Sequence, residues 1–201
     1  MSWKIIRFAK EEEAAGILSV YEPYVRETAI TFECETPSLD EFRERIREIS
    51  RDYPYLVCLM DGRIAGYAYA HRQMERQAYQ WNAELSVYIA KDCLRCGIGK
   101  ALYGVLTDIL RLQNVRNLYG GVTSPNANSE KLHESMGFKR LGVYHATGYK
   151  CGAWHDVAWF EKRIGDSAAH PAHPAPFKSI REIDKTRLDE ILSYHTRSLN
   201  T

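Results

Sequence analysis

The sequence predicts an α/β fold in which helices pack on a mixed sheet, and three observations support this prediction. Residues 83–89 alternate apolar and polar side chains, as expected of a half-buried strand. A glycine-containing stretch at 95–99 then leads into residues 98–112, whose apolar side chains recur at helical spacing. Strand-like and helix-like stretches also alternate along most of the chain. This alternation is typical of a sheet covered by helices.

The first third of the chain carries clear boundary signals. Residues 11–26 have the spacing of a helix, which Pro23 is expected to interrupt because proline lacks a backbone N–H. Ser38 and Glu41 have the spacing of a capping box, so a second helix should begin here. We expect that helix to end at residues 53–54, where a proline follows a tyrosine.

The remaining elements follow from apolar runs and the turn residues between them. Asp61 and Gly62 separate two apolar runs and therefore predict a β-hairpin. Gly137 is expected to close a short helix. Besides the helix after the capping box, we expect strands at 3–8, 55–60, 64–70, 83–90, 118–123, 138–144 and 157–162 and helices at 11–26, 98–112 and 128–136.

Composition limits the class of protein. The 201 residues are 45% hydrophobic and 26% charged, which is the balance of a soluble globular protein. A net charge of +1 gives no sign of attraction to nucleic acid or to a membrane surface. No apolar run approaches the roughly 20 residues needed to span a bilayer, and the first residues lack the apolar run of a secretion signal.

The five cysteines are scattered and odd in number, which favours reduced thiols and a cytoplasmic location. Cys93 and Cys96 are spaced like half a zinc site, but no second pair follows, so we expect no metal.

We expect three parts along the chain. Residues 1–164 should form one domain, and residues 165–177, which contain three prolines and several alanines, should form a linker. Residues 178–201 should form a helical extension, because Ser179 and Glu182 have the spacing of a second capping box before an amphipathic pattern. This helix could pack on its own domain or on a partner subunit.

The glycine-containing stretch has the pattern of an anion site. Gly97 and Gly99 stand at the start of the helix expected at 98–112. A loop of this kind can turn several backbone N–H groups toward a pyrophosphate, and the helix N-terminus adds a partial positive charge. A dinucleotide-binding motif would need glycine at position 102, where this chain has Leu102, and the spacing of an ATPase phosphate loop is absent. By itself, Gly-x-Gly is a weak signal and favours a tight turn that starts a helix.

A strand that carries Glu84, followed by a basic residue and Gly-x-Gly at a helix start, resembles the acyl-CoA-binding core of the GNAT acetyltransferase superfamily. Further motifs resemble its phosphinothricin N-acetyltransferase branch, which includes acetyltransferases of methionine sulfone and methionine sulfoximine. These motifs are residues 66–70, 76–81, 84–89, 132–134 and 148–157, together with Asn126, Ser129, Gly137 and Phe138. The resemblance covers residues 3–163, with departures from the usual loop at Leu94 and Cys96.

The resemblance implies a GNAT fold, acetyl-CoA as cosubstrate, and direct acetyl transfer in a ternary complex to the α-amino group of a small amino-acid-like acceptor. It implies that Glu84 is the base, on a largely apolar strand where desolvation would raise the pKa of its carboxyl. Alternatively, Glu84 could pair with Arg76 or Lys150. His133 is the candidate general acid toward the CoA sulfur, or alternatively a structural histidine that ties two segments together.

The resemblance also implies binding residues and a homodimer. The expected acetyl-CoA contacts are Val87, Tyr88, Ile89, Arg95, Cys96, Gly97, Ile98, Gly99, Lys100, Ala101, Asn126 and Ser129, with the N–H of Val87 as oxyanion donor. The expected acceptor contacts are Glu75, Arg76, Gln77, Tyr79, Phe32 and Lys150. Two alternatives remain: an acetyltransferase for another amine, such as a protein N-terminus or a polyamine, and a CoA-binding module without catalysis. Arg76 and Lys150 favour an anionic acceptor over a polyamine.

Overall fold

Seven strands form one sheet in the order β1-β2-β3-β4-β5-β7-β6 in the computed structural model, which describes residues 3–165 and 174–201. Only β4 and β5 are parallel, and every other neighbouring pair is antiparallel. The mixed sheet confirms the predicted fold class. The strands are β1 (Lys4–Phe8), β2 (Tyr55–Met60), β3 (Arg63–Arg72), β4 (Asn82–Ile89), β5 (Asn117–Ser124), β6 (Lys139–Lys150) and β7 (Ala153–Arg163).

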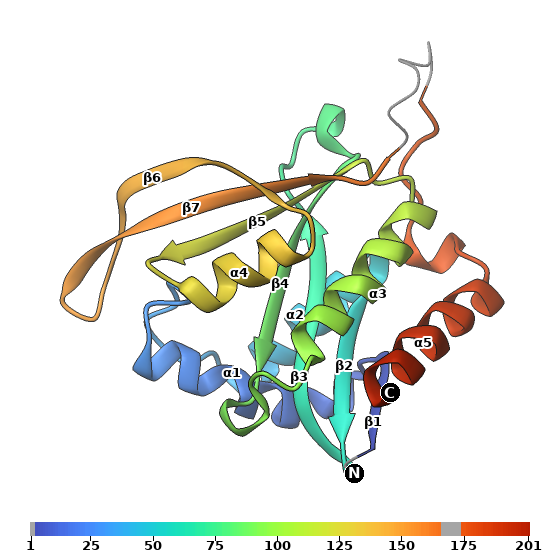
Figure 1. Cartoon of the computed structure of the whole chain (residues 1–201), viewed down its shortest axis with the longest axis horizontal. Helices are drawn as coiled ribbons and strands as arrows, with labels where there is room; N and C mark the ends of the chain where they lie inside the picture. The colour runs from blue at the N-terminus through green and yellow to red at the C-terminus, as the bar shows by residue number, and fades with distance from the viewer. Residues whose placement is uncertain (1–2, 166–173) are drawn as a thin grey trace.

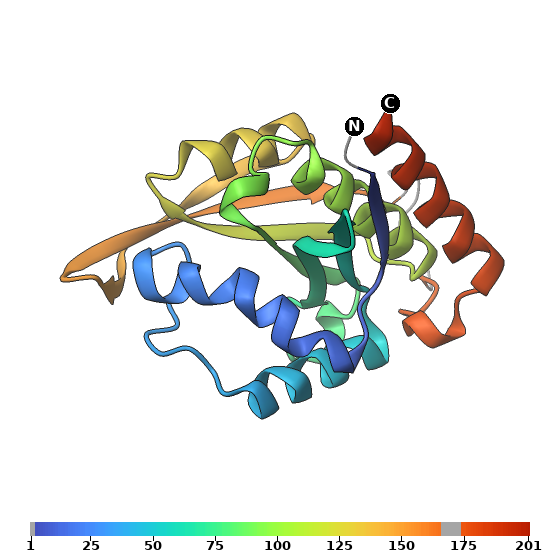
Figure 2. The same ribbon diagram turned by 90° about the horizontal axis from the view of Figure 1, so that it is seen from below.

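Helices cover both faces of this sheet (Figures 1 and 2). They are α1 (Ala14–Glu27), α2 (Leu39–Asp52), α3 (Ile98–Leu112), α4 (Ala127–Ser135) and α5 (Lys185–Asn200). In Figure 2, α1 and α2 lie on one side of the strands and α3 and α4 lie on the other. Each side has its own buried apolar cluster, so the sheet is packed on both faces.

Parallel pairing between β4 and β5 is short. Their register runs only from Asn82 opposite Asn117 to Glu84 opposite Tyr119. Beyond this point β4 continues beside β3, whereas β5 continues beside β7 as far as Ser124. The two strands therefore diverge after Glu84, as Figure 1 shows.

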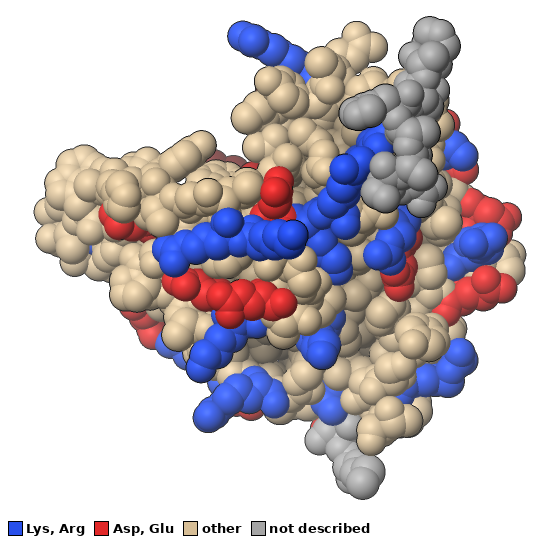
Figure 3. Space-filling model, turned by 45° about the horizontal axis from the view of Figure 1, so that its top comes forward, with Lys and Arg blue, Asp and Glu red and all other residues tan. Residues whose placement is uncertain are grey.

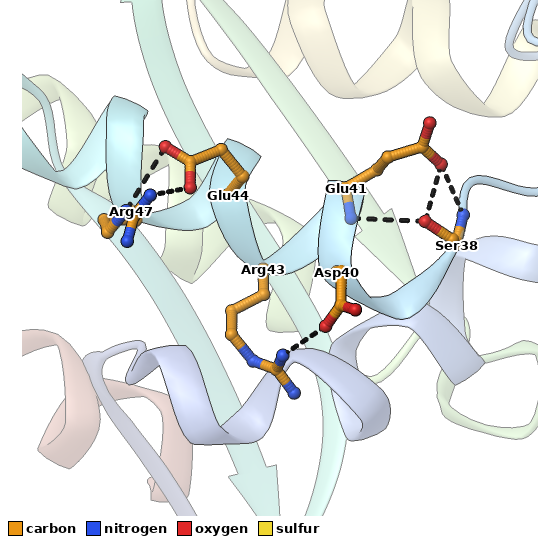
Figure 4. Close-up of polar contacts among 6 residues, drawn as sticks. All are labelled: Ser38, Asp40, Glu41, Arg43, Glu44 and Arg47. Carbon is orange, nitrogen blue, oxygen red and sulfur yellow. Dashed lines mark hydrogen bonds and ion pairs between the residues drawn. The ribbon is translucent and has the colours of Figure 1, made fainter.

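The N-terminal signals of α2 are confirmed. The Ser38 hydroxyl accepts from the Glu41 backbone N–H at 3.3 Å, and the Glu41 carboxylate accepts from the Ser38 N–H at 2.8 Å (Figure 4). The exposed side of the helix carries ion pairs with i,i+3 spacing, between Asp40 and Arg43 and between Glu44 and Arg47. Such surface pairs contribute only a few tenths of a kcal/mol each, so burial of the opposite apolar face is the larger stabilising term.

The predicted break at Pro23 is wrong, because α1 runs through it to Glu27. The missing N–H of proline costs one helical hydrogen bond. Buried side chains on both sides of it, Val20, Tyr21 and Val25, anchor the helix to the sheet and offset that cost.

The last two strands are longer than predicted. They extend to a tight turn in which Cys151 and Gly152 both have a positive φ, of 52° and 78°. Their pairing continues through irregularities at 140–142 and 144–148, where the residues in between have no directly opposed partner. The resulting hairpin extends away from the rest of the sheet in Figure 1.

The C-terminal helix starts later than predicted. The capping box of Ser179 and Glu182 is present, but it begins a single 3-10 turn. A new N-cap, Asp184, accepts from the Arg187 N–H at 3.1 Å and starts α5. Most of the predicted linker, residues 166–173, lies outside the described residues.

Helix α5 covers the free edge of β1. The Asn200 side chain accepts from the Lys4 N–H at 2.9 Å and donates to the Lys4 carbonyl at 2.8 Å. Two residues along the strand, the Thr196 hydroxyl accepts from the Ile6 N–H at 3.0 Å. These side chains occupy the backbone groups that an edge strand otherwise exposes.

The His195 ring of α5 packs against Gly104 of α3. A Cβ atom on Gly104 would lie 2.5 Å from His195 Cε1. We expect Gly104→Ala to destabilise the protein, because the ring would have to move and break its 2.9 Å hydrogen bond to Asp108. In a His195→Ala background the same substitution should instead stabilise the protein by up to about 1 kcal/mol, since alanine favours helix more than glycine. Chemical denaturation of the four proteins measures both signs. The same sign in both backgrounds would contradict this packing.

Candidate active site

Two adjoining cavities lie along β4 from Glu84 onward, where β5 no longer pairs with it. The smaller cavity has a volume of about 70 Å³. It is lined by Glu84 and other residues of β4, by residues of β5, and by Tyr103 and His133. The larger, of about 370 Å³, is lined by the glycine loop at the start of α3 and by residues of α4. Both cavities share the residues Ile30, Val87, Asn126 and Ser129. The structure therefore brings the predicted base and the predicted anion site into one continuous region.

Glu84 is half-buried at the point of divergence. Desolvation raises the pKa of its carboxyl, and the charge of His71, directly across on β3, lowers it by a smaller amount. Within the described residues, Glu84 forms no ion pair with Arg76 or Lys150. A carboxylate whose pKa is raised by burial, and which pairs with neither Arg76 nor Lys150, is suited to accept a proton.

His133 is buried between α3, α4 and the sheet. Its Nδ1 lies 2.8 Å from the Ser129 carbonyl, which can only accept, so Nδ1 carries the proton. Its Nε2 then accepts from the Tyr103 hydroxyl at 3.2 Å. A Cβ atom on Gly120 would collide with this Nε2, so glycine at that position makes room for the ring. Burial lowers the pKa of His133 and therefore favours its neutral form.

The glycine loop has the geometry of an anion site. Arg95 and Gly97 both have a positive φ, of 61° and 78°, and Gly97 is the N-cap of α3. Left-handed residues alternating with others aim successive N–H groups into one concavity, and the helix N-terminus adds a partial positive charge. Arg95, Gly97, Gly99 and Lys100 all line the larger cavity. These residues fit a pyrophosphate.

Most of the other expected acetyl-CoA residues also line the two cavities. Val87, Ile89, Ile98, Asn126 and Ser129 line the larger one, and Tyr88 lines the smaller. Asn126 has a structural task as well, since its side chain accepts from the Ser129 N–H at 3.2 Å and caps α4. Two further expected residues, Cys96 and Ala101, line neither cavity.

The expected acceptor residues are less concentrated. Glu75, Arg76, Gln77 and Tyr79 lie on an exposed connection between β3 and β4 and line neither cavity. This connection leads into β4 two residues before Glu84.

Phe32 and Lys150 instead join the segment after α1 to the β6–β7 hairpin. The Lys150 ammonium is buried and donates to the Thr31 carbonyl at 2.8 Å. A Cβ atom on Gly148 would collide with the Phe32 ring, which lies 6.4 Å from the His155 ring between centroids. These contacts hold the segment after α1 against the hairpin.

Sequence reasoning missed Tyr103, which lines the smaller cavity together with Glu84 and His133. Its spacing in α3 is that of a core residue of an amphipathic helix. No neighbouring residue in the sequence indicates that its hydroxyl lies in a cavity. Burial raises the pKa of Tyr103, with a further contribution from the charge of Glu84. Tyr24 lines the larger cavity, and its hydroxyl donates to the Ile89 carbonyl at 2.5 Å.

No group of three or more His, Cys, Asp or Glu side chains is placed to hold a metal ion within residues 3–165 and 174–201. Nor does any helix in this part of the chain combine the length and apolar character needed to cross a bilayer.

The profile of the family described as "Acetyltransferase (GNAT) domain" matches residues 6–159. The chain belongs to this family. Phosphinothricin N-acetyltransferase of Streptomyces viridochromogenes is 30% identical over 178 residues, which cover 89% of this chain and 95% of the relative. The L-methionine sulfoximine/L-methionine sulfone acetyltransferase of Salmonella typhimurium is 29% identical and covers 83% of this chain and 98% of its own length.

A solved structure gives the same assignment. The GNAT superfamily phosphinothricin acetyltransferase of Sinorhizobium meliloti in complex with AcCoA superposes with a TM-score of 0.78 and 30% identity. The match covers 84% of this chain and 96% of that structure. Sequence and fold therefore agree on GNAT membership.

We expect Glu84→Gln to stabilise the protein more at pH 8 than at pH 4. Burial raises the pKa of Glu84 above its ordinary value of 4.5. Ionisation of Glu84 therefore lowers the free energy of unfolding only as the pH rises above 4.5. At pH 4 the carboxyl is largely protonated in both the folded and the unfolded state, and the amide should bring little gain. Urea denaturation at the two pH values measures the difference. An equal change in the free energy of unfolding at both would contradict the raised pKa.

Proposed function

We propose that this GNAT protein transfers the acetyl group of acetyl-CoA to the α-amino group of a small amino-acid-like acceptor, by direct transfer in a ternary complex. The observation that carries the proposal is the single region formed by Glu84, the part of β4 that no longer pairs with β5, and the glycine loop. Relatives named for phosphinothricin and for methionine sulfoximine or sulfone support the acceptor class.

Glu84 is the proposed base. It takes a proton from the acceptor ammonium, directly or through a water, and the free amine attacks the thioester carbonyl carbon. A C–N bond forms, the nitrogen loses its second proton, and the C–S bond breaks. The electron pair of the C–S bond leaves with the CoA sulfur, which takes up a proton to give the free thiol of CoA. The backbone N–H of Val87 is the proposed donor to the carbonyl oxygen while that oxygen carries negative charge.

Binding of acetyl-CoA follows from the geometry of the loop and of β4. Arg95, Gly97, Gly99 and Lys100 would hold the pyrophosphate, and the part of β4 beyond Glu84 would pair with the pantetheine arm as an added strand does. Asn126 and Ser129 would contact the arm from the start of α4.

His133 faces the same cavity as the proposed base. We propose it as the group next to the departing sulfur, with its ring fixed by Tyr103 and Ser129. Protonation of the sulfur by His133 would require the imidazolium, because the Nδ1 proton is already donated. Since burial lowers the pKa of His133, that form is disfavoured before acetyl-CoA binds.

For the acceptor, we propose Glu75, Arg76, Gln77 and Tyr79 on the β3–β4 connection, with Phe32 and Lys150 shaping the opposite side through their contacts. Arg76 is exposed and can meet a carboxylate or phosphinate.

We expect release of CoA thiol from acetyl-CoA with phosphinothricin, methionine sulfone or methionine sulfoximine, and a loss of at least about a hundredfold in kcat for Glu84→Gln. Glu48→Gln, an exposed change on α2, is the matched control and should keep normal turnover. Spermidine, a short peptide and ordinary amino acids complete the panel. Turnover with spermidine or peptide alone would overturn the acceptor class. CoA binding without turnover of any acceptor would point to a binding module.

We also propose a homodimer formed through the β6–β7 hairpin, and a cytoplasmic location. Large side chains on this hairpin, Leu141, Tyr144, Tyr149 and Trp154, are each more than half exposed. The corresponding end of the molecule is mostly uncharged in Figure 3, whereas Lys, Arg, Asp and Glu are interspersed over the rest of that view. An exposed apolar patch of this kind favours association. All five cysteines are free, which supports a reducing compartment.

Sedimentation tests the dimer. We expect the double variant Tyr149→Ala and Trp154→Ala to sediment as a monomer where the native protein sediments as a dimer, because it removes two large exposed rings of the hairpin that pack on each other. Trp3→Ala, which removes an exposed ring near β1, should leave the dimer intact. A native protein that is monomeric at micromolar concentration would refute the proposal.

A further inference from the structure

Helix α5 lies beyond the family match, which ends at residue 159, yet it packs along α3, the helix that begins with the glycine loop. The two helices run antiparallel, since residues near the end of α5 contact the start of α3 and residues before α5 contact its end. Figure 2 shows α5 beside α3 and β1. The chain thus returns, after its last strand, to the helix that carries the acetyl-CoA site.

The end of α5 reaches the glycine loop itself. Leu199 Cδ1 lies 3.4 Å from the position that a Cβ atom on Gly97 would take, so its methyl group lies beside the loop at Gly97. Gly97 has a φ of 78° and is the N-cap of α3. Leu199 is half-buried and packs on the same apolar cluster as α3.

A second contact fixes the middle of α3. The His195 ring lies against Gly104, where a side chain would collide with it, and His195 Nε2 lies 2.9 Å from a carboxylate oxygen of Asp108. The His195 ring of this pair is largely buried. The pair therefore fixes the rotation of α5 about its axis and its position along α3.

The other end of α3 is held by the segment that precedes α5. The Gln113 side chain donates to the Lys178 carbonyl at 2.8 Å, and the Asn114 side chain donates to the Pro176 carbonyl at 2.7 Å. These contacts tie the start and middle of α3 to α5 and its end to the segment before α5. Helix α5 is itself anchored to the sheet edge by the bonds of Thr196 and Asn200 to β1.

The placement of α3 matters because its first N–H groups are the proposed pyrophosphate donors. Hydrogen bonds weaken steeply with misalignment, and the field of a helix N-terminus falls off within its first turn. Gly97 has no side chain and can adopt many backbone conformations, so a neighbour that holds it in the left-handed conformation lowers the cost of binding.

We propose that α5 is a positioning element for acetyl-CoA, and that Leu199 is the positioning residue that holds Gly97 and the start of α3 in the pyrophosphate-binding conformation. This inference rests on the proposed function, because it assigns the glycine loop to the pyrophosphate. Leu199 itself does not touch the reacting atoms, so its effect falls on the affinity for acetyl-CoA and leaves the chemical step unchanged.

The experiment compares Leu199→Ala with Leu192→Ala in the full chain. Leu192 lies two helical turns earlier on the same face of α5, is more buried, and packs on the core. We expect Leu199→Ala to raise KM for acetyl-CoA and the Kd of CoA by about three- to tenfold, with kcat and KM for the acceptor unchanged. Leu192→Ala should lower the melting temperature more, because it leaves a larger cavity, but should change the Kd of CoA by less than about twofold.

If Leu199 is a positioning residue, Leu192→Ala is the less stable variant and Leu199→Ala binds CoA more weakly. If the effect is general destabilisation, the less stable variant also binds CoA more weakly. Leu199→Met, which refills most of the volume, should restore the native Kd. The inference is overturned when Leu199→Ala binds CoA as the native protein does, or when both alanine variants weaken CoA in proportion to their lost stability. Failure of the native protein to bind CoA would instead overturn the proposed function.

Discussion

The parting of β4 and β5 after Glu84 is the constraint on which the site depends. A strand in the middle of a sheet normally has both edges paired, and unpaired backbone groups away from water are costly. In residues 85–89 and 120–124, β4 and β5 no longer pair with each other. The edge of β4 that faces β5 there can be satisfied by a ligand that runs along it. The helices α3 and α4, whose N-termini flank this opening, supply the remaining polar groups.

Burial has one electrostatic effect on Glu84, Tyr103 and His133, which line the smaller cavity. It raises the pKa of Glu84 and of Tyr103, and it lowers the pKa of His133. Each shift favours the uncharged form of its group. A charge that develops there meets a medium of low dielectric constant, in which each hydrogen-bond donor acts more strongly than it would in water.

The sequence was sufficient for the parts of the fold that depend on local pattern. Strand β4, the glycine loop and α3 are all marked by periodicity and by residues with special backbone needs. Pro23 was misread because tertiary packing of α1 outweighs a local cost. The length of the β6–β7 hairpin was missed because exposed aromatic residues and interrupted register hide the alternation of a strand.

The site shows the same limit. Glu84 stands out as an acid on an apolar strand, whereas Tyr103 is indistinguishable from a core residue until His133, thirty residues later, is placed beside it. The partners of Lys150 and Phe32 were equally hidden, because Thr31 and Gly148 are far from them in the chain or carry no signal of contact. Contacts of this kind depend on how helices and strands pack in three dimensions. The local pattern of a single sequence does not show that packing.

The bonds between α5 and β1 show how two kinds of secondary structure can match in length. Four residues of a helix advance about 6 Å along its axis, and two residues of a strand advance about 6.6 Å. Thr196 and Asn200 are four apart in the helix, and their targets, Ile6 and Lys4, are two apart in the strand. A helix can therefore stand in for the missing neighbour of a sheet by placing a polar side chain once per turn. Within the part of the chain that the structure describes, the sheet ends at β1, and α5 occupies this edge in place of a further strand or a second molecule.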